Sequence, residues 1–357
     1  MSIILFIVIL GIIVFVHEYG HFLLARKNGI VVEEFAIGMG PLIYGKKKGD
    51  TLYSIRLLPI GGFCKMLGAE EESNEEGSFN NAHVFGRIAV IAAGSIFNII
   101  LSFVLVFILL SFNGFNSLAV SSVSDGSPAY HAGLQQGDVI RSIDGRRMLV
   151  FANASMAISQ SQGVPLDVLV NRNGERVLMS ITPQPHQLPN GATTYIIGFT
   201  STPFVGMLNR QPSEVQSANL FNTIQHSYYL VLHFIRSVAT GLIELFTFNV
   251  ALDDIAGPVG LVTIIGDAYE SAIEYSPWVV ASNMMMLAAL ISANLALFNL
   301  LPIPALDGGR LIFLFIEAIR GRPISPEREG LIHMFGFVLL IGLIIVVSFN
   351  DIFRLFR

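Results

Sequence analysis

The sequence predicts a polytopic α-helical membrane protein with four transmembrane helices, a membrane-associated β-hairpin and an inserted β-rich domain. Three observations predict this class. Of the 357 residues, 53% are hydrophobic and only 13% are charged, whereas typical soluble domains carry about 25% charged residues. The apolar residues are concentrated in four long blocks. The region between the second and third blocks is more polar and carries the turn residues of a small β domain.

The four apolar blocks are long enough to cross a bilayer. Their approximate limits are 3–24, 88–112, 279–301 and 331–349. A helix needs roughly 20 residues to cross about 30 Å of hydrocarbon, and each block approaches or exceeds that length. Residues 220–248 form a further apolar stretch, but His226, His233, Arg236 and Glu244 interrupt it. For this stretch we expect an amphipathic helix or helix pair at the membrane surface.

The basic residues predict the orientation of the spans. All five lysines lie between the first and second blocks, and a short connection with four arginines follows the third block. The longer connection between the second and third blocks contains seven arginines and no lysine. Because short basic loops stay in the cytoplasm, we expect both termini and the central region to be extracytoplasmic.

The central region has the sequence pattern of a folded β domain. Its turn signals are Asp125-Gly126, Gly137-Asp138, Asp144-Gly145 and Asn173-Gly174. The last of these separates two apolar segments, which predicts a β-hairpin, and residues 151–160 suit a helix. The expected segments are a first transmembrane helix (1–27), a cytoplasmic loop with the hairpin (28–86), a second helix (87–113), the β domain (114–200), surface helices (201–278), a third helix (279–310), a cytoplasmic loop (311–330) and a fourth helix (331–357).

The strongest chemical signal lies in the first apolar block, in the run from His17 through Glu18 to His21. On a helix, residues four apart share a face, so both imidazoles can bind one Zn²⁺. Glu18 can then reach metal-activated water as a general base. The alternatives are a chance match to the motif and three ionisable residues that only pair structurally with another helix. Ionisable groups in a membrane helix are costly and normally functional, which favours the metal.

A catalytic zinc needs a third protein ligand and an open position. Asp307 fits, because Pro302 and Pro304 end the helix of the third block just before it and two glycines follow it. Leu-Asp-Gly alone is also a common turn. The four-span topology brings Asp307 to the same membrane side as His17 and His21, whereas a fifth span would place it on the opposite side.

Together these motifs resemble those of the bacterial site-2 proteases, most closely the type that cleaves anti-sigma factors. The stretch from Gly126 to Gly145 is similar to bacterial PDZ domains and lies where that family carries one. The resemblance implies that His17, His21 and Asp307 bind Zn²⁺ and that Glu18 is the catalytic base. It implies an intramembrane zinc metalloendopeptidase in the bacterial inner or plasma membrane. The implied activity is regulated intramembrane proteolysis of single-span proteins such as anti-sigma factors or signal-peptide remnants, with the active site near the cytoplasmic side.

The resemblance also implies substrate-binding residues. Asn294 and Asn299 match asparagines that hold the substrate backbone, although helix–helix hydrogen bonding is an alternative role for them. Gly61 and Gly62 lie in a stretch that resembles the family's membrane-re-entrant hairpin, whose strand edge pairs with an extended substrate. Residues 257–260 match a family motif of unclear role, and we expect a turn near the membrane surface there.

Other readings of the sequence are less well supported. A non-catalytic membrane scaffold or chaperone would not need the complete set of His17, His21 and Asp307. A metal transporter would need more polar spans. The formal net charge is −5 and no basic stripe is present, so we expect the lipid bilayer but no nucleic acid as a partner. We expect no metal site from His226 and His233, and no partner can be identified from the sequence for the four other histidines, which are His83, His131, His186 and His333.

Overall fold

The computed structural model describes residues 1–69, 73, 75–188, 191, 193–209, 215–247 and 257–355. The chain divides into two compact units. The helical unit combines Met1–Leu105 with Phe234–Arg357, and the β-rich unit is Val106–His233.

Four helices of the described chain are long and apolar enough to cross a membrane. They are α1 (Ser2–Lys27), α2 (Val84–Asn113), α7 (Pro277–Leu300) and α9 (Pro326–Leu355). The predicted number of hydrophobic spans is therefore confirmed. The further apolar stretch forms α5 (Leu220–Phe246), which is not among these four helices.

Two segments are more helical than we expected. The cytoplasmic loop expected over residues 311–330 contains most of α8 (Asp307–Arg320), whose Leu311 and Leu314 are buried, so tertiary packing stabilises this helix. The turn expected at residues 257–260 is instead the start of α6 (Pro258–Ile273). A proline at the first helical position has a backbone already suited to a helix and lacks an N–H that would be unpaired there, which explains this start.

The first turn of α6 is capped by a residue far along the chain. The backbone N–H groups of Gly257 and Gly260 donate to the carboxylate of Asp351 in α9, at 3.1 Å and 2.8 Å. Asp351 is only 3% exposed. A carboxylate at a helix N-terminus pairs with otherwise unsatisfied donors and with the positive end of the helix dipole. This contact ties α6 to the last helix.

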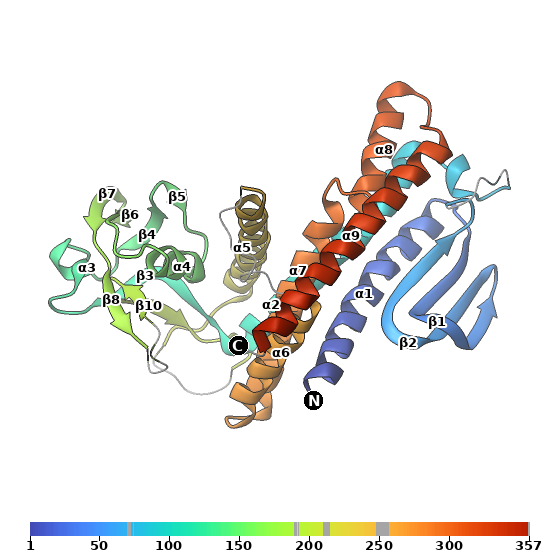
Figure 1. Cartoon of the computed structure of the whole chain (residues 1–357). Coiled ribbons are helices and arrows are strands. Elements are labelled where there is room, and N and C mark those ends of the chain that lie inside the picture. The colour runs from blue at the N-terminus through green and yellow to red at the C-terminus, as the bar shows by residue number, and fades with distance from the viewer. Residues whose placement is uncertain are drawn as a thin grey trace. The chain divides into compact units, whose positions relative to one another are not determined.

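The predicted hairpin is present as β1 (Val32–Lys48) and β2 (Thr51–Met66), and it lies against α1 (Figure 1). The two strands are long and bend back on themselves. Residues 34–37 of β1 pair with 52–55 on one side and with 62–65 on the other. Residues 62–66 pair on one side only, so within the described chain they are an edge strand of this small sheet.

Two apolar clusters hold α1 in place. The first joins α1 to β1, β2, α2 and α8 and includes Phe22, Phe35 and Val90. The second surrounds the other half of α1, where Ile13 and Ile265 of α6 are both completely buried and residues of α7 pack against them. A helix packed along most of its length is rigid, which suits it to present side chains in fixed positions.

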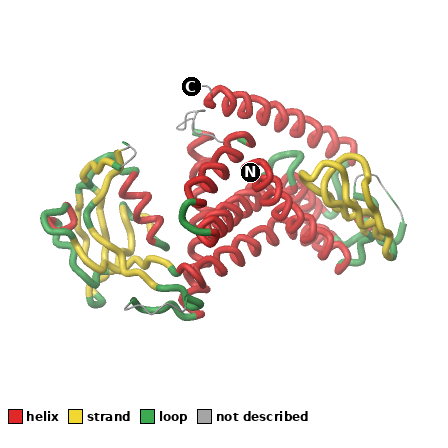
Figure 2. The backbone as a smooth tube through the Cα atoms, turned by 90° about the horizontal axis from the view of Figure 1, so that it is seen from below, coloured by secondary structure: helices red, strands yellow, loops and turns green. Residues whose placement is uncertain are grey.

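The β-rich unit is built on one antiparallel sheet in the order β10-β3-β4-β6-β7. Its elements are β3 (Phe115–Val123), α3 (Pro128–His131), β4 (Val139–Ile143), β5 (Arg146–Arg147), α4 (Phe151–Ser159), β6 (Leu166–Arg172), β7 (Glu175–Ile181), β8 (Gln184–Gln187), β9 (Thr193–Ile196) and β10 (Phe199–Phe204). Figure 2 shows these strands in yellow with α4 in red packed beside them. The predicted β-rich domain and its β6–β7 hairpin around Asn173-Gly174 are confirmed.

The β-rich unit has its own core and a buried ion pair. Ile140, Val168 and Ile181 are among the fully buried residues of one apolar cluster. Asp138 is 1% exposed and accepts hydrogen bonds from Arg172 at 2.8 Å and 2.7 Å and from the Gln135 N–H at 2.9 Å. These donors, with Arg172 the strongest, hold the pKa of the Asp138 carboxyl below its ordinary value.

Candidate metal centre

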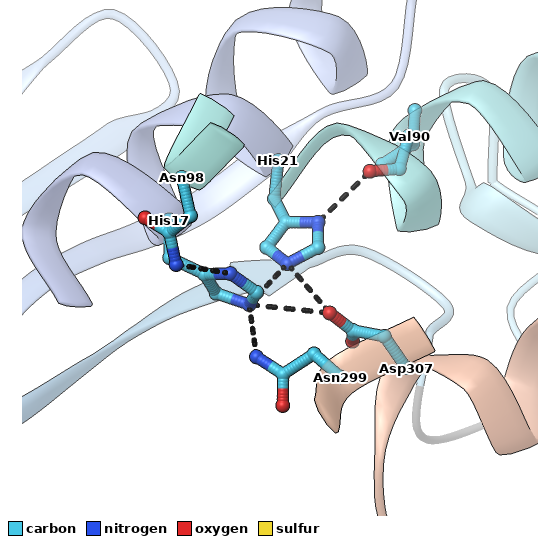
Figure 3. Close-up of polar contacts among 6 residues, drawn as sticks. All are labelled: His17, His21, Val90, Asn98, Asn299 and Asp307. Carbon is cyan, nitrogen blue, oxygen red and sulfur yellow. Dashed lines mark hydrogen bonds and ion pairs between the residues drawn. The ribbon is translucent and has the colours of Figure 1, made fainter. Parts of the chain in front are cut away.

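Helix α1 brings two histidines together on one buried face. His17 and His21 lie one turn apart and are 7% and 6% exposed. Their Nε2 atoms are 3.1 Å apart, and Figure 3 shows the two rings converging. The helical spacing that predicted a shared face is therefore confirmed by the structure.

Asp307 completes the group from the first turn of α8. Its Oδ2 atom lies 3.1 Å from Nε2 of His17 and 3.3 Å from Nε2 of His21 (Figure 3). In a tetrahedral zinc site with bonds of about 2.0–2.1 Å, ligand atoms are about 3.3 Å apart. Within the described chain these three residues are the one group of His, Cys, Asp and Glu side chains that could hold a metal ion. Their geometry fits zinc.

The protonation of His21 also fits metal binding. Its Nδ1 lies 2.8 Å from the Val90 carbonyl oxygen, which can only accept, so Nδ1 carries the proton. The lone pair of Nε2 then faces Asp307. The Asp307 Oδ2 atom is buried and has no hydrogen-bond partner in the described chain. Lone pairs that meet in a buried position repel one another unless a cation lies between them.

His17 has an asparagine partner on α2. Nδ1 of His17 lies 3.4 Å from Nδ2 of Asn98, which is completely buried, while the Asn98 Oδ1 atom is buried without a hydrogen-bond partner. A half-turn of this amide would let Oδ1 accept the Nδ1 proton of His17. That arrangement leaves the lone pair of Nε2 of His17 available to a metal. Outer partners of metal-binding histidines commonly fix the ring tautomer in this way.

Gly94 of α2 packs directly against both histidines of the site. A Cβ atom on Gly94 would lie 2.4 Å from Nε2 of His21 and 2.6 Å from Cε1 of His17. Only a glycine lets the α2 backbone approach both rings so closely. Sequence reasoning missed this residue. The available signal was an isolated glycine within a long apolar helix, which often marks close packing between helices.

Glu18 lies between the histidine pair and the small sheet. A Cβ on Gly62 would be 3.6 Å from Cγ of Glu18, and the Cys64 backbone lies near the Glu18 carboxylate. The edge strand 62–66 therefore runs beside Glu18. Gly61 occupies a different position, where an added Cβ would meet the side chain of Met39.

The two predicted asparagines of α7 differ in their distance from the centre. Nδ2 of Asn299 lies 3.4 Å from Nε2 of His17 (Figure 3). Asn294 makes no hydrogen bond to the histidines in the described chain, and its Oδ1 atom is buried without a hydrogen-bond partner there. A buried amide oxygen without a partner is costly, so it is available to a ligand that supplies an N–H.

A tight loop carries the chain from α7 to Asp307. Ala305 in this loop has a left-handed backbone with φ of 76°. Added Cβ atoms on Gly308 and Gly309 would lie 2.0 Å and 2.6 Å from the carbonyl oxygens of Leu301 and Ile303. The paired glycines thus permit a close backbone approach, and α8 begins directly against the loop.

The histidines of α5 have structural partners. The His226 ring stacks on Phe115 with the centroids 3.6 Å apart. Nδ1 of His233 lies 2.7 Å from Nδ2 of Asn153. Burial lowers the pKa of both histidines, so they are neutral at pH 7. Neither belongs to a metal-ligating group in the described chain.

The whole chain is similar to bacterial membrane proteases. The model of peptidase family M50 matches residues 5–343. The zinc metalloprotease RasP of Geobacillus kaustophilus is 32% identical, over 99% of this chain and 98% of the relative. The regulator of sigma-W protease RasP of Bacillus subtilis is 31% identical, and the probable protease eep of Enterococcus faecalis is 29% identical, each over 99% of both chains.

These likenesses extend across both the helical and the β-rich unit, so they do not rest on a short motif. They agree with a cluster of two histidines and an aspartate whose spacing suits zinc. They do not favour a non-catalytic scaffold. The protein is a member of peptidase family M50, the site-2 proteases, and is a zinc metalloprotease of the membrane.

Proposed function

We propose that His17, His21 and Asp307 hold the zinc ion and that Glu18 is the general base in hydrolysis of peptide bonds in single-span membrane proteins. The observation that carries this assignment is the triangle of ligand atoms, whose sides measure 3.1, 3.1 and 3.3 Å. When bound, zinc supplies Lewis acidity that polarises a peptide carbonyl and lowers the pKa of water.

Glu18 performs the proton transfers. It follows His17 directly on α1, so its carboxylate is carried by the same rigid helix as the two imidazoles. It accepts a proton from the attacking water and returns it to the leaving amide nitrogen. The carboxylate lies near the Cys64 backbone of the edge strand. Glu18 and the substrate bound at the edge strand therefore lie close together.

The edge strand 62–66 presents the substrate to Glu18. A transmembrane helix hides its carbonyl groups in internal hydrogen bonds, so the substrate must be extended before it can be cut. Pairing of an extended segment with the free edge at Gly62 supplies backbone hydrogen bonds to it. The side-chain amides of Asn294 and Asn299 on α7 bind further backbone groups of that segment, which lack water at this depth.

The β-rich unit selects substrates outside the cell. We assign it as a PDZ domain that excludes bulky ectodomains or receives a peptide end, with both chain termini on the same extracytoplasmic side. Because one relative is named regulator of sigma-W protease, we propose anti-sigma factors as a substrate class, with signal-peptide remnants as a second. The active site then lies near the cytoplasmic face, where the short basic loops are.

A cleavage assay tests the assignment. Purified protein in detergent is incubated with a single-span model substrate, with and without a chelator, and compared with Glu18→Gln and His21→Ala. Loss of the base should lower kcat about 10²–10⁴-fold with the zinc content unchanged, because Gln cannot accept a proton. His21→Ala should lose zinc as well as activity. Undiminished cleavage by Glu18→Gln, or zinc retained at wild-type affinity in His21→Ala, contradicts the proposal.

A further inference from the structure

The last helix contacts the loop that ends in Asp307. The backbone N–H of Ala305 donates to Nδ1 of His333 in α9 at 2.9 Å, a contact between residues 28 apart in sequence. Ala305 precedes Asp307 by two residues. His333 therefore reaches the loop of the third metal ligand, although the sequence offered no partner for it.

Ala305 has an unfavourable backbone conformation. Its φ of 76° lies in the left-handed region, which costs an L-residue other than glycine or asparagine about 1–2 kcal/mol. Such a conformation persists only where surrounding contacts hold it. Within the loop, the N–H groups of Ile303 and Leu306 donate to backbone carbonyl oxygens, but none of these bonds involves the Ala305 N–H. The hydrogen bond from Ala305 to His333 is a contact that can stabilise this conformation.

The position of His333 is itself well defined. One turn along the same face of α9, a Cβ on Gly336 would lie 2.6 Å from the carbonyl oxygen of Pro304, so α9 closes tightly on the loop. The His333 ring packs edge-on against Phe313 of α8, with centroids 5.5 Å apart. Because Nδ1 accepts, Nε2 carries the proton, and it lies 3.8 Å from Oε1 of Glu329.

We propose that His333 is a positioning residue for the metal centre. By accepting the Ala305 N–H, it holds the loop in the left-handed conformation that directs the Asp307 carboxylate at His17 and His21. The inference rests on the proposed role of Asp307 as a metal ligand. It assigns to α9 a part in the site although α9 supplies no ligand.

The test uses full-length purified protein and three substitutions of His333. His333→Asn keeps an acceptor at the δ position, His333→Gln moves the acceptor by one bond, and His333→Leu removes it. Zinc affinity is measured by chelator competition, the ligand set by the absorption spectrum of the Co²⁺-loaded protein, and kcat and KM with a single-span model substrate. Met334→Ala, next to His333 but 60% exposed, is the matched control.

We expect His333→Leu to weaken zinc binding about 10–100-fold, as removal of an outer partner of a metal ligand does. It should also lower kcat more than it changes KM and alter the Co²⁺ spectrum. His333→Asn should stay near wild type, and Met334→Ala should not differ from it. Adding Ala305→Gly to His333→Leu should restore much of the lost zinc affinity, because glycine adopts the left-handed conformation without strain.

Wild-type zinc affinity and spectrum in His333→Leu would overturn the inference while leaving the ligand assignment intact, provided that His21→Ala loses zinc. Equal affinities in His21→Ala and wild type would instead refute the ligand assignment itself. If His333→Leu does not fold, the Asn and Gln variants decide. The inference requires tighter zinc binding in His333→Asn than in His333→Gln, and equal binding would refute it.

Discussion

Left-handed backbone is accommodated differently near the metal centre and at two turns of the β-rich unit. In the β-rich unit, left-handed non-glycine residues include Asp144 and Asn173, with φ of 49° and 53°. Asp and Asn adopt this conformation more readily than other residues that carry a Cβ atom. In the loop before Asp307 the left-handed residue is Ala305, which has no such side chain. At these two turns the residue type itself tolerates the left-handed conformation, whereas in the loop at the site a hydrogen bond to α9 supports it.

Two aspartates show the same difference in hydrogen bonding. Both oxygens of Asp138 in the β-rich unit are paired, with Arg172 and with the Gln135 N–H. The Oδ2 atom of Asp307 faces two histidine nitrogens and has no hydrogen-bond donor in the described chain. A satisfied carboxylate contributes to stability, while an unsatisfied one is ready to bind a cation. Functional and structural carboxylates can therefore be told apart by their partners.

The largest expected effect is that of Gly94→Ala. Its added methyl group would collide with both imidazoles, since the Cβ would lie 2.4 Å from Nε2 of His21. A displacement of about 1 Å at a reacting centre costs about 10²-fold in rate. We expect kcat/KM to fall by at least about that factor and zinc affinity to fall with it, as measured by cleavage and chelator competition.

The matched control for Gly94→Ala is Gly342→Ala in α9, where an added Cβ meets nothing within 4 Å. This variant should keep wild-type activity and zinc affinity. If the two alanine variants behaved alike, the close approach of α2 to the histidines would not matter for the centre. The metal centre would then be no more sensitive to an added methyl group than the exposed part of α9.

Ile140→Ala should affect the β-rich unit alone. Ile140 in β4 is 1% exposed, and truncating a buried isoleucine costs about 2–5 kcal/mol of unfolding free energy. Hydrogen exchange on the full-length protein should show reduced protection in β4 and β6. Zinc affinity should not change. Leu178→Ala in β7, where the leucine is 66% exposed, is the control. A parallel loss of zinc binding in Ile140→Ala would show that the two regions are not independent.

The smallest effect expected is that of Asp138→Asn, and it depends on pH. Hydrogen bonds from Arg172 lower the pKa of Asp138, so the carboxylate stabilises the fold above its unfolded pKa of about 3.9. That contribution is lost as pH falls through the lower folded pKa. At neutral pH the variant should lose about 1 kcal/mol, and it should approach wild type as pH falls through the lowered folded pKa.

Hydrogen exchange in β4 and β6 as a function of pH measures this effect. The exposed Asp125, changed to Asn, is the control and should leave the pH profile unaltered. An Asp138→Asn variant whose stability differed from wild type by the same amount at every pH would contradict the assigned role of the ion pair.

Local patterns in the sequence predicted much of this molecule. The spacing of His17 and His21 requires only that the block be helical, and Asp307 was recognisable because prolines end the preceding helix. The apolar blocks and the Asn173-Gly174 turn likewise depend on short-range rules. These features were predictable because each is decided by residues close together in the chain.

The remaining features depend on contacts between distant segments. Gly94 matters because α2 crosses α1 at the histidines, and His333 matters because α9 meets the loop before Asp307. Neither crossing point can be read from periodicity. The helix α8 was missed for a similar reason, since the burial of Leu311 and Leu314 against other elements stabilises it. Tertiary packing decides such cases.

The cap of α6 by Asp351 has a consequence for biosynthesis. The two N–H groups that donate to this carboxylate precede it by 94 and 91 residues. The ribosome must therefore synthesise a further 91 residues after Gly260 before the first turn of α6 can acquire its acceptor. A C-terminal truncation that removes this aspartate leaves the two donors at the start of α6 without their acceptor.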